Sequence, residues 1–148
     1  MCAGRALCHR SLAVYRHNPP ITCAISKGSN LKRLILMRHA KSDWSSGAVS
    51  DHDRPLNARG RRAATGLGDW MRAQGLRPDQ VLCSSAERTG ETYLRLALGG
   101  DVVVHFSRAL YLATADEILQ ALRGASGDPV LMLGRTPGIG VAAGAVLA

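Results

Sequence analysis

A chain of 148 residues can bury one hydrophobic core, so a single main domain is expected. It contains no apolar run near the roughly 20 residues that a membrane span needs. Its one Phe, two Trp and three Tyr offer few rings on which nucleic-acid bases could stack, so neither a membrane protein nor a nucleic-acid binder is expected. The net charge of +8 favours anionic partners without identifying them.

The first 30 residues differ in composition from the rest. They hold four of the 19 Lys and Arg residues, none of the 11 acidic residues and three of the four cysteines, whose spacings fit no standard zinc site. We interpret 1–30 as a basic leader, disordered or created by a start assigned too far upstream, and 31–148 as the domain. The alternative is an organelle-targeting segment; without targeting, we expect a cytoplasmic protein, because no cysteine pattern argues for an oxidising compartment.

From residue 31 onward, short apolar runs alternate with helical patterns. Four strands are predicted, at 32–37, 80–83, 101–106 and 129–133. Four helices are predicted between and after them: from an N-cap at Asn57 to a stop at Gly75, over 86–98, from a capping box at Thr114 to Arg123, and after Pro137. This alternation predicts an α/β fold, a three-layer sandwich with a mostly parallel central sheet covered by helices on both faces.

Three of the predicted strands end in polar turns that carry an arginine. The first strand runs into Arg38 and His39, the second into Ser84 and Arg88, and the last into Arg135. In parallel α/β sheets, ligands bind beyond the carboxyl ends of the strands. The sequence therefore predicts that these turns meet at one edge of the sheet and line a site for an anion.

His39 is the candidate nucleophile of such a site. An imidazole held at a strand end can attack phosphorus and form a phosphoramidate, while guanidinium groups such as those of Arg38, Arg54 and Arg88 match the phosphate oxygens. A proton donor for the leaving oxygen is also needed, and Asp51 is the nearest candidate. The alternative for His39 is a structural histidine at the edge of the core, hydrogen-bonded to the backbone.

Four motifs in order resemble those of the histidine phosphatase superfamily, with its phosphoglycerate mutase-like fold, and most closely those of the small SixA-type branch. They are "LMRHAKSDW", with Ala40 in place of the glycine of Arg-His-Gly, "DHDRPLNARG", "VLCSSAERTGET", with Ser85 in place of a proline, and "VLMLGRTPGIG". The resemblance covers residues 31–140.

The resemblance implies a role for each matching position. His39 would carry the phosphoryl group, Arg38 and Arg88 would clamp its oxygens, Arg54 and Ser84 would line the pocket, and Asp51 would donate the proton. It implies no metal and no organic cofactor, because the arginines supply the positive charge.

The activity implied is that of a cofactor-independent phosphatase that works through a phosphohistidine. The partner would be a phosphorylated protein or a small phosphate ester, and we expect a monomer. Little sequence separates the second strand from the last, which leaves few elements for a lid, and an open site favours a phosphoryl group borne by a protein histidine.

Position 135 departs from the family pattern, because Arg135 stands where the second catalytic histidine is expected. Losing one preorganised donor of this kind costs on the order of 10²–10³ in rate. The chain also stops in the helix that follows, where family members continue, so 31–148 is interpreted as truncated at its C-terminus. The alternative to an enzyme is therefore a weak or inactive pseudoenzyme that binds phosphate or a phosphoprotein, with Arg135 among its binding residues.

The segment "ARGRRAA" offers a weaker signal. At helical spacing Arg59 and Arg62 share one side, for which a solvated face is favoured over a nucleic-acid patch. Further along the same helix, Trp70 and Met71 are predicted to lie in or beside the core.

Overall fold

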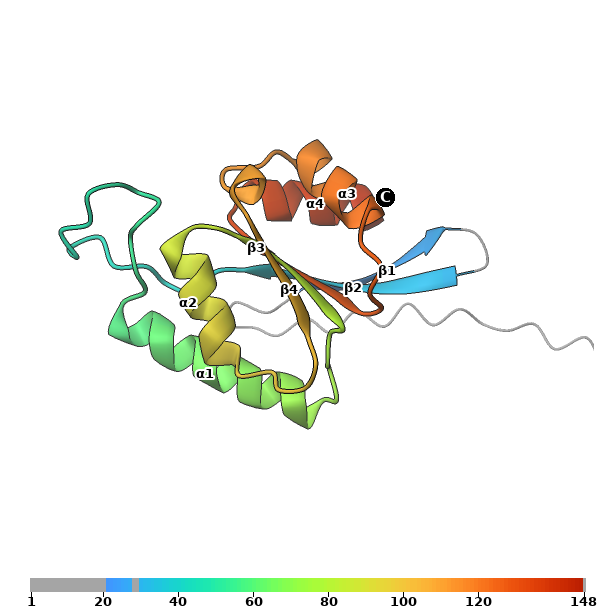
Figure 1. Ribbon diagram of the computed structural model, residues 1–148, viewed down its shortest axis with the longest axis horizontal. Helices are drawn as coiled ribbons and strands as arrows, with labels where there is room; N and C mark the ends of the chain where they lie inside the picture. The colour runs from blue at the N-terminus through green and yellow to red at the C-terminus, as the bar shows by residue number, and fades with distance from the viewer. Residues whose placement is uncertain (1–20, 28–29, 148) are drawn as a thin grey trace, which may run out of the picture.

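The computed structural model describes residues 21–27 and 30–147 of the chain. Their centre is a five-stranded sheet in the order β1-β2-β5-β3-β4. The strands are β1 (Ile21–Lys27), β2 (Asn30–Arg38), β3 (Gln80–Ser84), β4 (Val103–Ser107) and β5 (Val130–Gly134). The last four in spatial order, β2, β5, β3 and β4, run parallel, and β1 pairs antiparallel with β2 at one edge (Figure 1). The predicted, mostly parallel sheet is confirmed.

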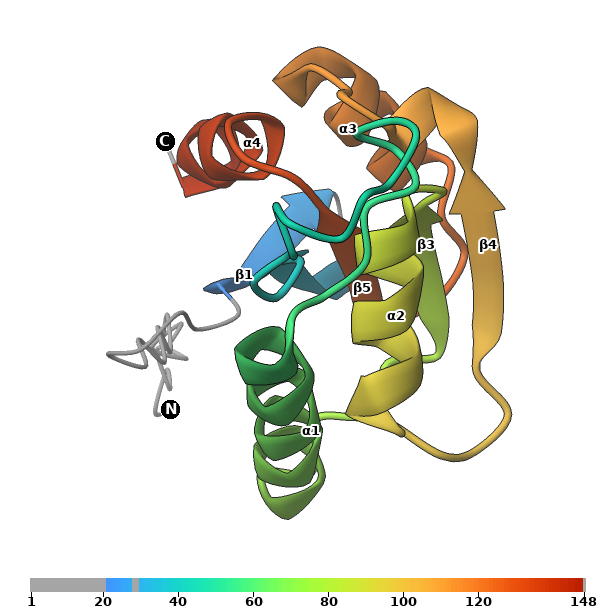
Figure 2. The same cartoon turned by 90° about the vertical axis from the view of Figure 1, so that its left-hand side faces the viewer.

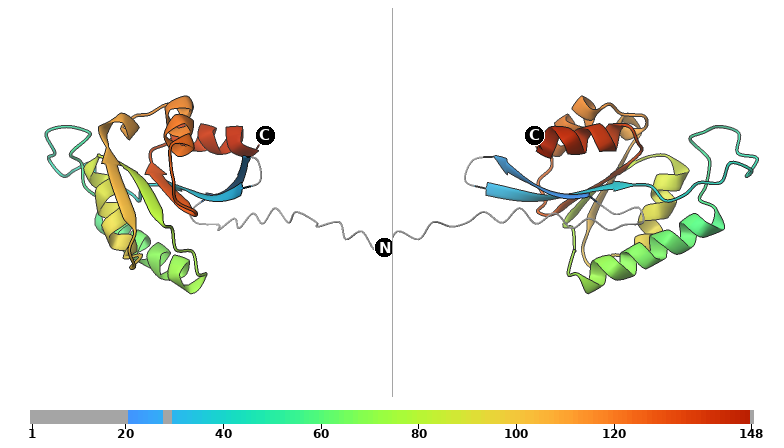
Figure 3. Two further views of the ribbon diagram at one scale, coloured as in Figure 1. Left: turned by 45° about the vertical axis from the view of Figure 1, so that its right-hand side comes forward. Right: turned by 180° about the vertical axis from the view of Figure 1, so that it is seen from behind.

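Helices cover both faces of the sheet. They are α1 (Ala58–Ala73) and α2 (Glu87–Leu96) on one face, and α3 (Ala115–Arg123) and α4 (Gly138–Leu147) on the other, with a 3-10 turn, η1 (Arg108–Leu110), before α3 (Figure 3). Both layers bury apolar stripes, as predicted for a three-layer sandwich.

The alternation of side chains along β2 divides the core in two. Leu34 and Leu36 face α3 and α4, whereas Ile35 and Met37 face α1 and α2, because successive side chains of a strand point to opposite faces. A strand buried on both sides must be apolar at every position, which is why the sequence signal here is a continuous apolar run. Such a strand is held rigidly, and so is the residue that follows it.

β1 lies before residue 31, the predicted start of the domain. Ile21 to Lys27 pair residue by residue with β2, from Ile21 opposite Leu36 to Lys27 opposite Asn30. The pairing gives partners to backbone groups of β2 on the side that β5 does not cover. The sheet therefore includes a strand that precedes the predicted boundary at residue 31, within a segment whose composition suggested a leader. Residues 1–20 lie outside the described part of the chain, and the leader interpretation of them stays a prediction.

The start of α1 is fixed against the loop that follows β2. The Asn57 side chain accepts a hydrogen bond from the Gly60 N–H at 2.8 Å, which confirms the predicted N-cap. A Cβ on Gly60 would lie 2.1 Å from the Lys41 carbonyl oxygen, so only glycine permits this approach. The loop from β2 is thereby held between α1 and the sheet edge. At α3, the predicted capping box of Thr114 and Glu117 is present.

Candidate active site

The turns after β2, β3 and β5 meet at the carboxyl edge of the sheet. Arg38 pairs with Gly134 in the ladder, and the His39 N–H donates to the Gly134 carbonyl at 3.0 Å. β5 lies between β2 and β3, so the turns that follow these strands are neighbours. The connection from residue 39 to residue 57 crosses this edge between the two helix layers (Figure 2). The predicted convergence of the three turns is confirmed.

The His39 ring is buried and has one unprotonated nitrogen. Its Nδ1 donates to the Ala40 carbonyl at 2.7 Å, which assigns the proton to Nδ1 and leaves Nε2 unprotonated. The side chain is 6% exposed. Burial above all, with the positive charges of Arg88, Arg38 and Arg135, lowers the pKa of His39 to about 4 against the opposing effect of the Ala40 carbonyl. At neutral pH the ring is an uncharged imidazole that presents Nε2.

Arg88 connects His39 to Asp51. Its guanidinium is 1% exposed, and its Nε–H donates to His39 Nε2 at 3.3 Å. Nη2 lies 2.9 Å from Asp51 Oδ2, and Nη1 donates to the Asp51 carbonyl oxygen. A buried cation needs such partners, and Asp51 supplies two of them. The arginine is therefore fixed with its donors beside the nucleophile.

The Asp51 carboxylate is bound by further donors. Arg54 Nη2 lies 2.9 Å from Oδ1, Arg135 Nη1 lies 3.9 Å from Oδ2, and the Tyr111 hydroxyl donates to Oδ2 at 2.9 Å. Partial burial raises the pKa of Asp51, but Tyr111, Arg88 and Arg54 outweigh it and hold the pKa below its usual range. In the chain without substrate Asp51 is thus an ionised acceptor, and its predicted role as proton donor remains a prediction.

A cavity of about 400 Å³ opens next to His39. Its walls include Arg38, Lys41, Arg54 and Arg135, so it is surrounded by positive charge. Trp44, 80% exposed at its rim, lies with its ring centroid 3.5 Å from the Arg54 guanidinium carbon, a cation–π contact. The arrangement suits an anion next to His39 Nε2.

Two of the predicted residues lie differently from what the motifs suggest. Ser84 is buried behind the cavity, where its hydroxyl accepts from the Ala86 N–H at 3.4 Å, and it does not line the wall. Arg135 does line the wall, but its side chain is 41% exposed and contacts Asp51 only at 3.9 Å. Its side chain is thus largely open to solvent while it lines the cavity.

Sequence reasoning missed Tyr111 and His52. Tyr111 follows η1, which continues from β4, and the parallel direction of β4 was the signal that could have placed it at this edge. The His52 ring packs edge-on against Tyr111 with centroids 4.9 Å apart, and its Nε2 lies 2.9 Å from the Ser85 hydroxyl. Ser85, which replaces a motif proline, thereby helps hold the Asp51 loop in place.

The structure offers no group of three His, Cys, Asp or Glu side chains that could hold a metal ion within the described ranges 21–27 and 30–147. Across the same ranges, no helix is both long enough and apolar enough to cross a membrane.

Fold and site together define an α/β protein with a histidine and an arginine cluster at the carboxyl edge of its sheet. The sequence model of the histidine phosphatase superfamily, branch 1, matches residues 34–111, more than half of the chain. The chain belongs to this superfamily, and its structural neighbours place it in the SixA-like branch.

Relatives and solved structures agree with this assignment. An uncharacterised Mycobacterium tuberculosis protein, Rv1276c, is 36% identical over 103 residues, which are 68% of this chain and 63% of that protein. A protein from Nakamurella multipartita, assigned as a phosphohistidine phosphatase SixA, is 38% identical with a TM-score of 0.67, over 73% of this chain and 61% of that one. A second such assignment, from Agrobacterium tumefaciens, is 26% identical with a TM-score of 0.73, over 77% and 75%. The chain thus spans less than two thirds of the Mycobacterium and Nakamurella proteins.

Proposed function

We propose that this chain is a cofactor-independent phosphatase that acts through a phosphohistidine at His39, with a protein-borne phosphohistidine as its substrate. The single observation that carries this is the buried, neutral His39, whose Nε2 faces the Arg88 guanidinium. The similarity to the two proteins assigned as SixA phosphohistidine phosphatases supports the substrate class.

The reaction runs in two steps. Nε2 attacks the phosphorus, the Nε2–P bond forms as the bond to the leaving atom breaks, and the leaving atom takes up a proton. Water then attacks the phosphorus, the Nε2–P bond breaks, and inorganic phosphate leaves. The hydrogen bond from Nδ1–H to the Ala40 carbonyl keeps the ring oriented in both steps and stabilises the positive charge that develops on the ring.

The arginines stabilise the phosphoryl oxygens in the transition state. In the free chain Arg88 and Arg54 donate to Asp51, so an entering phosphoryl group must share or take over these donors. Its negative charge raises the pKa of Asp51, as does the loss of the arginine hydrogen bonds. Asp51 is then able to hold a proton and pass it to the leaving atom.

The direct test is to trap the intermediate. We expect the chain to hydrolyse a generic aryl phosphate, and to acquire a covalent phosphate after brief mixing with phosphoramidate. The label should be labile in acid and stable in base, as a phosphorus–nitrogen bond is and a serine phosphate is not. Mass spectrometry on fragments prepared at high pH locates it. A label stable in acid contradicts the mechanism.

A weak or inactive phosphate-binding protein is the second candidate, and Arg135 is the observation that favours it. Its guanidinium is half exposed and held by one distant ion pair, so it is poorly preorganised for the transition state. We expect the Arg135→His variant to turn over an aryl phosphate at least about tenfold faster, roughly 1.4 kcal/mol of barrier.

Thr136→Asn is the matched control, since Thr136 lines the same cavity beside Arg135. Tungstate affinity is measured in parallel by calorimetry. If turnover of Arg135→His is unchanged while tungstate still binds, Arg135 already performs the role of the second histidine.

A further inference from the structure

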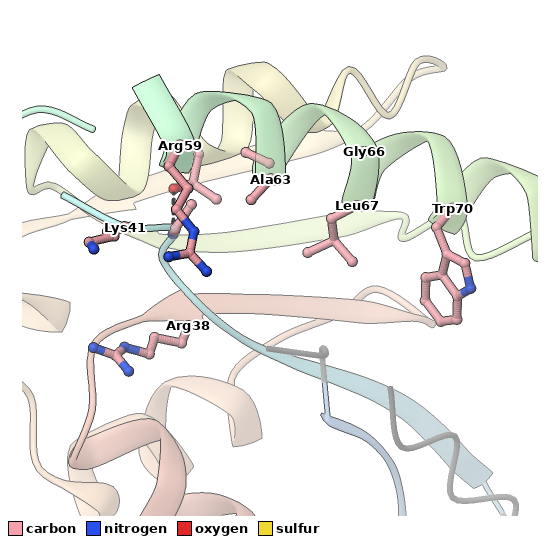
Figure 4. A pocket seen from close by; sticks show the side chains of 10 residues that line it. Arg38, Lys41, Arg59, Ala63, Gly66, Leu67 and Trp70 are labelled. Atoms are coloured by element: carbon pink, nitrogen blue, oxygen red, sulfur yellow. Dashed lines mark hydrogen bonds between the residues drawn. The ribbon is translucent and has the colours of Figure 1, made fainter. Parts of the chain in front are cut away.

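A second cavity, of about 460 Å³, adjoins the first along α1. The two share Arg38, Ala40 and Lys41 on their walls, so they are adjacent. Figure 4 shows it from close by: Arg59, Ala63, Leu67 and Trp70 project from α1 toward β2, and Arg38 and Lys41 lie at the Arg59 end. We name this second cavity the α1 groove.

The mouth of the α1 groove carries unneutralised positive charge. Arg38, Lys41 and Arg59 line it, and no carboxylate is present among its described lining residues. None of these three cations forms an ion pair with any residue of the described ranges. By contrast, Arg54 and Arg88 are engaged by Asp51. The groove mouth therefore offers three cations to an external anionic partner.

The far end of the groove is apolar. Arg59, Ala63, Leu67 and Trp70 follow one another at helical spacing and form a single stripe on α1, about 16 Å long at 1.5 Å per residue. Leu67 and Trp70 pack at the edge of the core, so the apolar wall is firmly held. Gly66 has open space where a side chain would stand, which widens the groove. Arg59 is solvent-exposed, as predicted for this face of the helix, and it also lines the groove.

We propose that the α1 groove binds a segment of the phosphoprotein substrate that carries acidic side chains near the phosphorylated residue and an apolar side chain further along. This rests on the proposed function. The cationic mouth shares its lining residues with the His39 cavity, so the acidic side chains are expected next to the phosphorylated residue and the apolar side chain further along. Residues 1–20, a rival occupant, contain three arginines and no acid, so the mouth repels them.

The proposal is tested by reversing one charge in the groove. In the full chain, Arg59→Glu is compared with Arg62→Glu, its control, which makes the same charge change three residues further along the same helix, at an exposed residue that lines neither cavity. The probes are two synthetic phosphohistidine peptides, one with acidic flanks and a leucine, one with neutral flanks, and an aryl phosphate. We expect Arg59→Glu to lower kcat/KM for the acidic peptide about tenfold, with Arg62→Glu within twofold.

The other probes exclude different explanations. Hydrolysis of the aryl phosphate should be unchanged in both variants, and Gly66→Phe, which fills the groove, should lower kcat/KM for the acidic peptide only. Equal losses in Arg59→Glu and Arg62→Glu, or an equal loss for the aryl phosphate, would overturn the proposal.

A binding measurement tests the groove proposal independently of the proposed phosphatase activity. Affinity for the acidic peptide, made with a non-hydrolysable phosphohistidine analogue, is measured by calorimetry without any need for turnover. If no substrate is hydrolysed but Arg59→Glu binds the acidic peptide more weakly than the wild type, the groove proposal is supported and the phosphatase proposal fails. If the phosphatase turns over but prefers neither peptide, the groove proposal fails alone.

Discussion

Replacing His39 by alanine is expected to lower aryl phosphate hydrolysis by a factor on the order of 10³ or more and to remove the acid-labile label entirely. The reason is geometric: His39 lines the cavity, and its unprotonated Nε2 lies beside the Arg88 guanidinium. The measurement is kcat/KM together with the amount of covalent phosphate. Because the pKa of His39 is about 4, wild-type kcat/KM should fall only as the pH drops through about 4, and not near the usual pKa of a histidine.

The control for His39→Ala is His105→Ala, which removes an exposed ring on β4 that does not line the cavity. His105→Ala should keep wild-type activity. His39→Gln is a second variant in which a polar side chain of similar size fills the buried position, so a loss of activity cannot be attributed to a cavity in the core. Label that persists at wild-type level in folded His39→Ala would place the nucleophile elsewhere and refute the mechanism.

The layered fold was predictable because its signals are local. The continuous apolar run of β2, the N-cap Asn57 and the capping box at Thr114 each depend on neighbours within a few residues, and each is found as predicted. The meeting of Arg38, Ser84 and Arg135 followed from one further rule, that parallel strands bring their carboxyl ends to one edge.

Pairings between distant segments were not predictable in the same way. β1 was missed because its basic, cysteine-bearing surroundings suggested a leader, although Ile21, Cys23 and Ile25 alternate with smaller or polar residues as a strand does. Tyr111 could not be placed beside Asp51, 60 residues away, without knowing how β4 ends. Side-chain direction was also beyond the sequence, as the buried Ser84 shows.

The arrangement around Asp51 is the least predictable and the most consequential part of the site. Motif position made Asp51 a proton donor, whereas the structure shows a carboxylate that accepts from Arg88, Arg54 and Tyr111. A carboxylate bound by these arginines competes with the phosphoryl group for them. The same residue is thus expected to oppose binding of the anion and to assist the chemistry that follows.

Asp51→Asn is therefore expected to move binding and turnover in opposite directions. Tungstate should bind at least about tenfold more tightly, because a neutral amide replaces the carboxylate that occupies Arg88 and Arg54. Turnover of an aryl phosphate should fall by about 10²–10⁴, the range that a positioned proton donor contributes. Calorimetry with tungstate and steady-state kinetics measure the two effects on one preparation.

Asp53→Asn is the matched control, because Asp53 lies two residues away and contacts Ser50 and His52. It forms no ion pair with Arg54, Arg88 or Arg135, the arginines that contact Asp51. It should leave both quantities near wild type. Damage to the fold would weaken tungstate binding and turnover together, so tighter binding with slower turnover cannot come from misfolding. Tighter binding with unchanged turnover would keep Asp51 as a competing anion and assign the proton to another donor. Unchanged binding would show that the arginines release Asp51 at no cost, and the competition inferred from their contacts would be wrong.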